Sequence, residues 1–284
     1  MAVKQLCGKL IVLPLLPDQI KLFLSPEQLI VLHQNGKFWK PALNLKMSSC
    51  DASEHTSNWK SAVLLLEDVL KEMKPKTRVE ILLSNHFVRY QLMPSDARLG
   101  SYDEELAYVK FNFREAYGEI ANDWKFSWGP GFNIEPQVVS AIDGDLFSQL
   151  SALVLQHGGR LHSVQPYLMR VFNGLNTAYH RKSFRFMMVE NGRFCSGVLN
   201  KGVWSSLRSI KFEGDWQSNL ELLVNRELLL LDELPGFPDL LLCLPKKISL
   251  DFLPSAPIKL IEINQAKLLL NHFPLQKMEG GASL

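Results

Sequence analysis

The sequence predicts an α/β protein with mixed sheets, in which two halves repeat one order of elements. Each half is expected to open with a three-strand meander, to continue with a helix and then to give a buried strand. In the second half the meander is expected at 185–190, 193–199 and 203–212, with tight turns between the strands. Between the two meanders, helices and strands alternate, which is typical of an α/β protein.

The first half is expected to open with a small antiparallel meander. Three extended runs, at 9–15, 20–24 and 28–33, are separated by breaks that contain proline. The turn at 34–37, Gln-Asn-Gly-Lys, is typical of a hairpin. Residues 41–57 are polar and irregular, which favours a surface loop.

The stretch Val79–Pro94, VEILLSNHFVRYQLMP, is interpreted as the centre of a sheet. Its first half has apolar residues on both sides, which indicates a strand buried on both faces. A polar break at 84–86 follows, and the second extended run ends at Pro94. The chain before and after this stretch is expected to lie on either side of it.

Apolar stripes and capping residues predict the helices. One helix is expected from the cap Asn58 to about Met73, and another begins at a capping box of Ser101 and Glu104 and ends near Tyr117. The other predicted elements are strands at 124–128, 137–142, 160–164, 240–244 and 258–263, and helices from Asp143 or Asp145 to 156, from Pro166 to about 179, and at 216–231.

Composition excludes several classes of protein. The net charge of +2, from 31 basic and 29 acidic residues, argues against charge-driven binding of nucleic acid. No run reaches the roughly 20 apolar residues that span a bilayer. The apolar run at 10–16 contains Pro14 and lacks a cleavage site, so a strand is favoured over a signal peptide. We therefore expect a cytoplasmic protein that reaches a membrane only through a partner.

The four cysteines are widely scattered, and no pair has metal-ligand or redox spacing. Cys195 and Cys243 lie in apolar runs and are expected to be core residues. The apolar run at 220–234, LELLVNRELLLLDEL, must be largely buried, either in the core, which is favoured, or under a partner.

The polar break Ser84-Asn85-His86 is the candidate partner-binding site, because open α/β sheets often place ligands at the end of a central strand. A functional interpretation makes Ser84, Asn85 and His86 part of a groove. The alternative is an ordinary strand break with polar caps, and the sequence leaves both open. No Gly-x-Ser-x-Gly motif is present, so Ser/His/Asp catalysis is not expected.

Other polar clusters have ordinary explanations. Residues 103–105, Asp-Glu-Glu, are expected to form the acidic first turn of a helix rather than an acid–base pair. His157 and His162 flank a Gly-Gly turn, which disfavours a metal site. The short basic segments at 180–182 and 246–247 could meet a phosphate or an acidic lipid, but solvated loops are favoured.

Three stretches of the first half carry a resemblance to a known family. Val79–Pro94 is similar to that family's strand, short break, second strand and closing proline. Residues 106–142 resemble its helix, aspartate-tryptophan strand and apolar strand, and residues 145–169 resemble its helix, glycine stop, short strand and proline-led helix. The family is the PilM and GspL group, the cytoplasmic actin-like components of type IV pilus and type II secretion assembly platforms.

The resemblance implies the actin-like ATPase (RNase H-like) fold, with two lobes that each contain a mixed sheet flanked by helices. The first lobe and its connecting helices are expected at 1–180, the second lobe at 181–275, and a disordered tail at 276–284.

Active members of the actin-like class hold nucleotide with two Gly/Asp-containing phosphate hairpins and a Gly-Gly adenosine turn, because bare backbone N–H groups must approach the phosphates. Here the hairpin at 15–32 has no glycine, and no aspartate precedes the turn of the hairpin at 187–199. Pro245-Lys246-Lys247 stands where the Gly-Gly turn would follow. We therefore expect no nucleotide cofactor, no metal and no catalytic residue.

The resemblance thus implies a catalytically inactive scaffold that binds the cytoplasmic tail of an inner-membrane pilus or secretion protein. In PilM-like proteins a groove between subdomains accepts such a tail, and no linear signature locates that groove here. One alternative is an active ATP-binding enzyme of the actin-like or sugar-kinase class. Another is an unrelated α/β fold with a similar order of elements.

Overall fold

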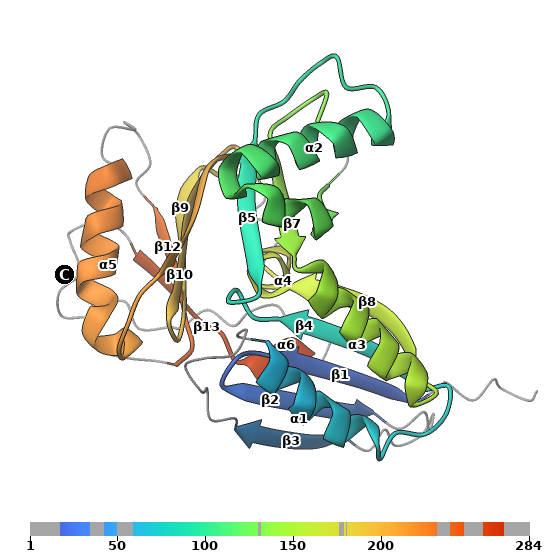
Figure 1. Cartoon of the computed structure of the whole chain (residues 1–284). Helices are drawn as coiled ribbons and strands as arrows, with labels where there is room; N and C mark the ends of the chain where they lie inside the picture. Colours follow the sequence, from blue (N-terminus) through green and yellow to red (C-terminus); the bar gives the residue numbers. More distant parts are fainter. Residues whose placement is uncertain are drawn as a thin grey trace, which may run out of the picture.

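The structure is a computed structural model that describes residues 18–34, 43–49, 59–129, 132–175, 179, 181–231, 239–246 and 258–269. Two five-stranded sheets dominate it (Figure 1). Sheet A has the order β3 (Leu43–Ser49), β2 (Gln28–Gln34), β1 (Gln19–Leu24), β4 (Arg78–Leu83), β8 (Arg160–Pro166). Sheet C has the order β11 (Val203–Lys211), β10 (Arg193–Asn200), β9 (Phe184–Glu190), β12 (Leu240–Leu244), β13 (Ile258–Glu262).

The two sheets share strand directions as well as strand order. In each, the first three strands along the chain form an antiparallel meander, and the fourth strand pairs in parallel with the first and with the fifth. The doubled arrangement of meander, helix and buried strand that the sequence predicts is therefore confirmed. We call the parts built on sheets A and C the first and second lobes.

Helices cover the sheets unequally. Two helices, α1 (Lys60–Leu70) and α3 (Gly144–Gln156), lie on one face of sheet A, the outer face (Figure 1). Two short helices, α4 (Tyr167–Asn173) and α6 (Gln265–Leu269), lie against the other, inner face. In the second lobe, α5 (Trp216–Leu231) packs on the outer face of sheet C through its buried side. The inner faces of both sheets share one continuous apolar core.

An inserted unit lies between β4 and α3. It comprises β5 (Val88–Met93), α2 (Tyr102–Tyr117), the 3₁₀ helix η1 (Glu119–Asp123), β6 (Lys125–Ser127) and β7 (Gln137–Ile142). Its strands form a third sheet of order β5-β7-β6, and α2 packs on that sheet over a separate small core. The unit stands above the two lobes, and β5 packs beside β11 of the second lobe (Figure 1).

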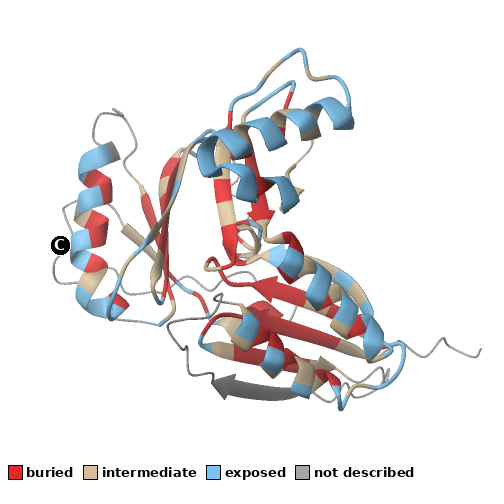
Figure 2. Ribbon diagram, viewed as in Figure 1, coloured by how far each residue is buried: buried red, intermediate tan, exposed pale blue. Residues whose placement is uncertain are grey.

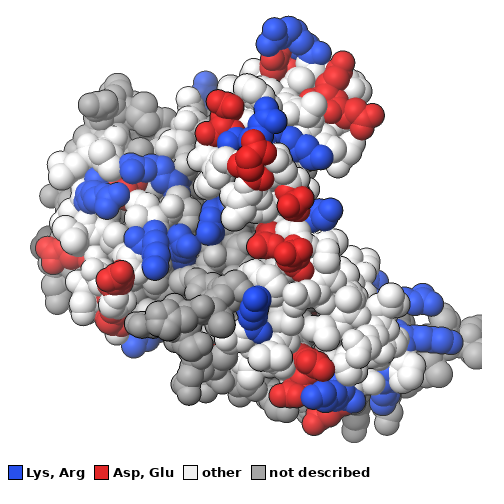
Figure 3. Space-filling model, viewed as in Figure 1, with Lys and Arg blue, Asp and Glu red and all other residues white. Residues whose placement is uncertain are grey.

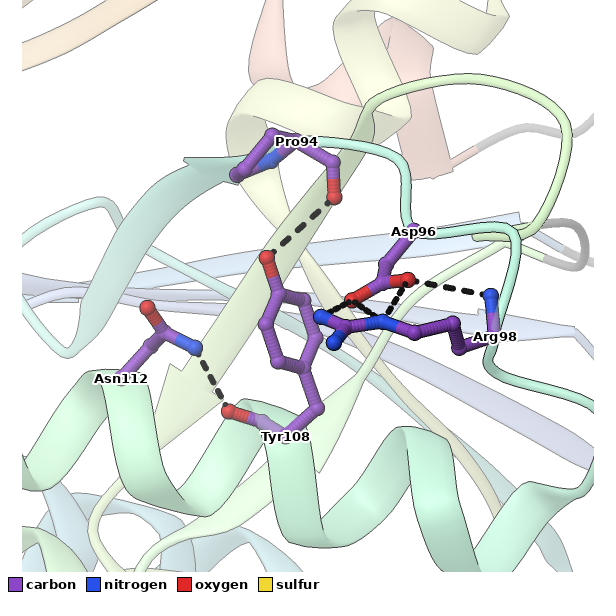
Figure 4. A network of polar contacts seen from close by, with 5 residues as sticks. All are labelled: Pro94, Asp96, Arg98, Tyr108 and Asn112. Carbon is purple, nitrogen blue, oxygen red and sulfur yellow. Dashed lines mark hydrogen bonds and ion pairs between the residues drawn. The ribbon is translucent and has the colours of Figure 1, made fainter.

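Polar contacts fix the start and the packing of α2. The predicted capping box is confirmed, because the Ser101 side chain accepts the Glu104 N–H while the Glu104 carboxylate accepts the Ser101 N–H. Ahead of the helix, Arg98 donates to both carboxylate oxygens of Asp96, and the Tyr108 hydroxyl donates to the Pro94 carbonyl (Figure 4). These contacts tie the loop after β5 to α2.

The interpretation of Val79–Pro94 as the centre of one sheet is wrong. The stretch is divided between sheet A, which contains β4, and the sheet of the inserted unit, which contains β5 at its edge. The polar break causes the division, because its side chains and N–H groups bond to other segments instead of continuing a ladder. Nor is β4 buried on both faces throughout, since Arg78 and Glu80 are only half-buried.

The predicted meander of the first half is also displaced. Residues 41–57 were expected to form a loop, yet 43–49 form β3. Leu43, Leu45 and Met47 alternate with polar residues, and this period of two fits a strand despite the polar composition. The strand expected at 9–15 and the tail expected at 276–284 lie outside the described residues.

Helix ends differ from the predictions in three places. The N-cap of α1 is Trp59, without a side-chain capping bond, rather than Asn58, and the helix ends at Leu70. The proline-led helix α4 ends at Asn173, before the expected residue 179. On α5 the expectation of burial holds for one side only, because Leu222 and Leu229 are 67% and 72% exposed.

Three further expectations concern the cysteines, membrane-spanning helices and the lobe boundary. Cys195 and Cys243 are buried and free, as predicted for core residues. Within the described residues, every helix is too short or too polar to cross a bilayer. The lobe boundary between residues 180 and 181 stays a prediction; sheet A ends at Pro166 and sheet C begins at Phe184. Figure 2 shows both main sheets largely buried and the outer surfaces of α2 and α5 exposed.

Candidate functional site

Two hairpin turns and the end of a parallel strand converge between the lobes. The turns are 25–27, between β1 and β2, and 191–192, between β9 and β10; the strand end is Pro245, after β12. Together they surround a hollow of about 140 Å³, which we call the inter-lobe pocket. Its lining is Ser25, Pro26, Glu27, Gln28, His86, Glu190, Asn191, Trp216, Pro245 and Gln265.

The first turn has few backbone donors left to offer a ligand. The Ser25 N–H donates to the Gln28 carbonyl at 3.0 Å, and the Gln28 N–H donates to the Ser25 hydroxyl oxygen at 3.1 Å. Pro26 has no N–H at all. Of the four residues 25–28, only Glu27 keeps a backbone donor outside these bonds, and its side chain brings a negative charge.

The second turn reaches across the pocket to the first. Gly192 adopts a φ of 72°, which a glycine tolerates without strain, and closes the hairpin. The Asn191 amide then donates to both carboxylate oxygens of Glu27, at 2.9 and 3.1 Å. His86 donates from Nε2 to the Asn191 carbonyl at 2.7 Å. The two lobes are thus joined by polar bonds at the place where their hairpins meet.

A buried carboxylate lies beneath this junction. Glu190, the last residue of β9, is 5% exposed. One of its oxygens accepts the Ser84 hydroxyl, and the other accepts the Asn85 N–H at 3.0 Å. Asn85 in turn accepts the Tyr90 hydroxyl at 2.7 Å and the Leu168 N–H at 3.1 Å. Glu190 therefore connects the second lobe to the break between β4 and β5.

Burial governs the ionisation of this network. It raises the pKa of Glu190 to about 7, although the bonds from Ser84 and Asn85 and the charge of Arg193 act in the opposite direction. Burial also lowers the pKa of His86, against the effect of its bond to the Asn191 carbonyl. Near neutral pH the junction therefore contains a neutral imidazole and a carboxyl group close to its midpoint.

The three residues predicted as a partner site meet at this junction. Ser84 and Asn85 are almost fully buried, and their side chains bond within the protein. Only His86 lines the inter-lobe pocket. Partner binding by Ser84, Asn85 and His86 stays a prediction, and in this geometry a partner would reach His86 directly while the other two hold it in place.

Glu27, Glu190 and Asn191 are the members of the site that sequence reasoning missed as a group. Glu190 carried one local signal, since it is the only acidic residue in the otherwise apolar run FMMVE that precedes a turn. A charged residue at the buried end of a strand needs a partner. Its partners Ser84 and Asn85 lie more than 100 positions away along the chain.

Other candidate clusters have the ordinary roles expected of them. Glu104 caps α2, and Glu105 accepts the indole N–H of Trp128 at 2.9 Å. His162 contacts the Arg78 guanidinium. Among the described residues no three His, Cys, Asp or Glu side chains gather as a metal site would require.

Comparison with solved structures places this geometry among known folds. The cytoplasmic domain of EpsL, an inner membrane component of the type II secretion system of Vibrio cholerae, matches with a TM-score of 0.55 and 10% identity, over 89% of this chain and 92% of that chain. A Bacteroides thetaiotaomicron protein with an actin-like ATPase fold and unknown function matches with a TM-score of 0.55 and 12% identity, over 85% and 87%.

The chain has an actin-like ATPase fold. A chain from the PilM-PilN type IV pilus biogenesis complex is similar as well, with a TM-score of 0.58 and 12% identity, over 80% of this chain and 81% of that chain. No protein-family model matches the sequence, and no curated protein matches it significantly. The predicted fold class is confirmed, and the two lobes of the actin-like fold are those built on sheets A and C.

The first turn of the inter-lobe pocket offers few donors to a polyphosphate. Phosphate sites need several free backbone N–H groups or cationic side chains near the oxygens. Here the first turn has one unoccupied N–H, and Glu27 faces the second turn with a negative charge. The arrangement favours holding the two lobes together over binding an anion between them.

Proposed function

We propose that the protein is a nucleotide-independent, actin-like scaffold that binds the cytoplasmic tail of an inner-membrane protein of type IV pilus or type II secretion assembly. The fold supports this proposal, because structures of the EpsL cytoplasmic domain and of PilM-PilN are similar to the chain over most of its length. The observation that carries it is the bond between Asn191 and Glu27, which occupies the gap between the two hairpins.

A hollow between α2 and α3 is the proposed place for the partner's tail. Figure 3 shows this hollow between the inserted unit and the first lobe, with acidic side chains gathered beside it. Glu119 and Asp123 lie on η1, and Asp143 and Asp145 lie at the start of α3, which meets η1 where Gly144 approaches the Asp123 carbonyl. Cytoplasmic segments of inner-membrane proteins are rich in Lys and Arg, so their charge complements this rim.

Nucleotide binding separates the scaffold from an active ATP-binding enzyme. A site for Mg-ATP at 100-fold excess over its dissociation constant stabilises a fold by about 2.7 kcal/mol. We expect no shift of the melting temperature with Mg-ATP, Mg-ADP or Mg-GTP at millimolar concentration. A saturable shift of several degrees, together with phosphate release, would show the enzyme instead.

Partner binding is tested with the cytoplasmic segment of a single-pass membrane protein encoded beside this chain. We expect the labelled segment to bind with micromolar affinity and to lose at least tenfold in affinity when Glu119→Gln and Asp145→Asn are combined, by about 1.4 kcal/mol. The matched control combines Asp68→Asn with Glu72→Gln. Both residues are exposed at or just after the C-terminal end of α1, and the two substitutions remove the same charge. His86→Ala tests the predicted site at the junction in the same assay. Full binding by the double variant would contradict the hollow as the site.

A further inference from the structure

The inner face of sheet A carries a polar row where a buried sheet usually carries apolar residues. Lys21 of β1 pairs with Glu80 of β4, and Glu80 pairs with Ser163 of β8, so the three side chains stand side by side on one face. On the outer face of the same strands, Leu22, Val79 and Ile81 are buried and apolar. The polar row is therefore local to the inner face.

Lys21 is the unusual member of this row. It is 4% exposed, and among the described residues its amine makes no hydrogen bond and no ion pair within 4 Å. Burying an ammonium group costs several kcal/mol unless partners replace its hydration shell. Burial accordingly lowers the pKa of Lys21, as do the charges of Arg170 and Arg78, and Glu80 compensates only in part. The surroundings of Lys21 thus lack a negative charge close enough to pair with its amine.

The amine lies at a hollow that opens between sheet A and the two inner helices. We call this hollow of about 40 Å³ the sheet A pocket. Its polar lining comes from four elements, β1, β4, β8 and α4, and consists of Lys21, Glu80, Ser163, Gln165 and Arg170. Leu268 and Leu269 of α6 provide an apolar wall, and Arg170 donates to the Leu268 carbonyl at 3.2 Å.

The charges at the sheet A pocket do not balance. The Gln19 side-chain amide donates to Glu80 Oε1 at 2.7 Å, and Arg78 Nε lies 3.6 Å from the same oxygen. Both partners of the Glu80 carboxylate therefore lie on sheet A. Arg78 Nε is buried and lacks a hydrogen-bond acceptor among the described residues. Lys21 and Arg78 therefore stand beside one carboxylate, Glu80, which bonds to Gln19 and Arg78 and leaves the Lys21 amine without a partner of its own.

We propose that the sheet A pocket binds an oxyanion, a carboxylate or phosphate group that accepts from the Lys21 amine. The buried, unpaired Lys21 amine selects an anion, and the Ser163 hydroxyl and the Gln165 amide offer neutral donors beside it. The apolar wall from α6 suits a ligand with a short carbon skeleton. This site lies on the inner face of sheet A and is separate from both the inter-lobe pocket and the hollow between α2 and α3.

The experiment titrates the full chain with sodium phosphate, sodium succinate and a short blocked peptide with one aspartate, at constant ionic strength set with chloride. Calorimetry and the melting temperature report binding. We expect saturable binding of at least one probe, and the three arms show whether the anion is a phosphate, a small carboxylate or a side chain of a peptide. No saturable binding of any probe up to 20 mM, roughly the weakest affinity that two charge-assisted bonds would give, would overturn the proposal.

Three variants make the result specific. Lys21→Met is expected to fold with unchanged or higher stability, because it replaces an unpaired buried charge, and to weaken anion binding at least about tenfold. Glu80→Gln removes the internal carboxylate and is expected to tighten binding about three- to tenfold, an effect that partial unfolding cannot produce. Lys71→Met removes an exposed lysine at the end of α1 and is the matched control.

Two outcomes contradict the assignment. Binding that is equal in Lys21→Met and in the wild type would place the anion elsewhere. A loss of stability in Lys21→Met comparable with that of a core truncation would show that the amine is already paired within the protein. Neither outcome depends on whether the chain binds a membrane partner, so the scaffold proposal is tested separately.

Discussion

Two equivalent strands, β4 and β12, show that the same place in a sheet topology can carry very different side chains. Each is the fourth strand of its sheet along the chain and pairs in parallel with both neighbours. β12, LLLCL, is buried at all five positions, as a strand covered on both faces requires. β4, RVEILL, has half-buried Arg78 and Glu80 on the inner face. Strand order therefore does not dictate which side chains a strand carries on its inner face.

The largest effect is expected from placing a buried lysine on β12, as sheet A has at Lys21 of β1. Leu241 is 1% exposed on the inner face of sheet C, among apolar side chains of the shared core. Leu241→Lys buries an ammonium next to Lys259, its neighbour in the parallel register, and that lysine already pairs with Asp239. We expect a loss of at least about 3 kcal/mol in the free energy of unfolding, measured by urea denaturation. Lys21→Met is the reciprocal change, and a similar loss there would erase the contrast.

The buried carboxylate at the end of β9 gives the next largest effect, and it depends on pH. Its pKa is about 7 in the folded protein, above the ordinary value of 4.5, so the folded state holds an extra proton between these values. The contribution of Glu190 to the free energy of unfolding is then fully present below about pH 4.5 and falls as the pH rises to about 7. The expected slope is about 1.4 kcal/mol per pH unit.

Glu190→Gln supplies the comparison, because it cannot ionise. We expect the difference in stability between wild type and variant to change with this slope over that pH range, as read from urea midpoints. A difference that stays constant with pH would mean that Glu190 titrates near its ordinary pKa. The first lobe has no counterpart at the end of β1, where Leu24 is fully buried.

A smaller effect is expected at the bond that joins the two hairpins. Asn191→Ala removes the donor to Glu27 on an exposed junction, and we expect a loss of about 1 kcal/mol in unfolding free energy. Asn200→Ala is the control, since Asn200 also follows a β-strand before a turn but bonds within its own lobe, to Ser183. Equal losses of unfolding free energy in both variants would show that the inter-lobe bond stabilises the protein no more than a bond within one lobe.

The smallest effect on stability is expected in the inserted unit, outside the two lobes. Asp96 and Arg98 form an exposed pair, and the bonds from Arg98 hold the pKa of Asp96 at about 2 (Figure 4). In Arg98→Ala we expect this pKa to return towards its ordinary value in an NMR titration, with no measurable change in melting temperature. A clear fall in melting temperature would show that the loop supports the lobes.

The second lobe could be predicted almost residue by residue, and the first could not. The apolar runs and the turns at 191–192 and 200–202 are local signals, and β9, β10, β11 and β12 follow them. In the first lobe, the alternating residues 43–49 are hidden in a polar composition, and β3 was missed. Nothing local in VRYQLM indicates that β5 joins a different sheet from β4, because sheet membership is decided by distant partners.

The site shows the same limit. The break at Ser84 is visible in the sequence, since polar turn-forming residues interrupt two apolar runs. Its pairing with Glu190 is a tertiary contact, and neither residue type specifies the other. The polar row on sheet A could have been noticed as Lys21 and Glu80 within apolar strands. That both face the same pocket follows only from the parallel register of β1 and β4.

The position of α6 has a consequence for biosynthesis. This helix contacts β1 and β2, so two strands near the start of the described chain receive inner cover from residues near its end. At a synthesis rate of roughly 5–20 residues per second, Leu268 is added on the order of tens of seconds after Phe23 and Ile30. The apolar cover of β1 and β2 is therefore completed only late in synthesis, when α6 has been made.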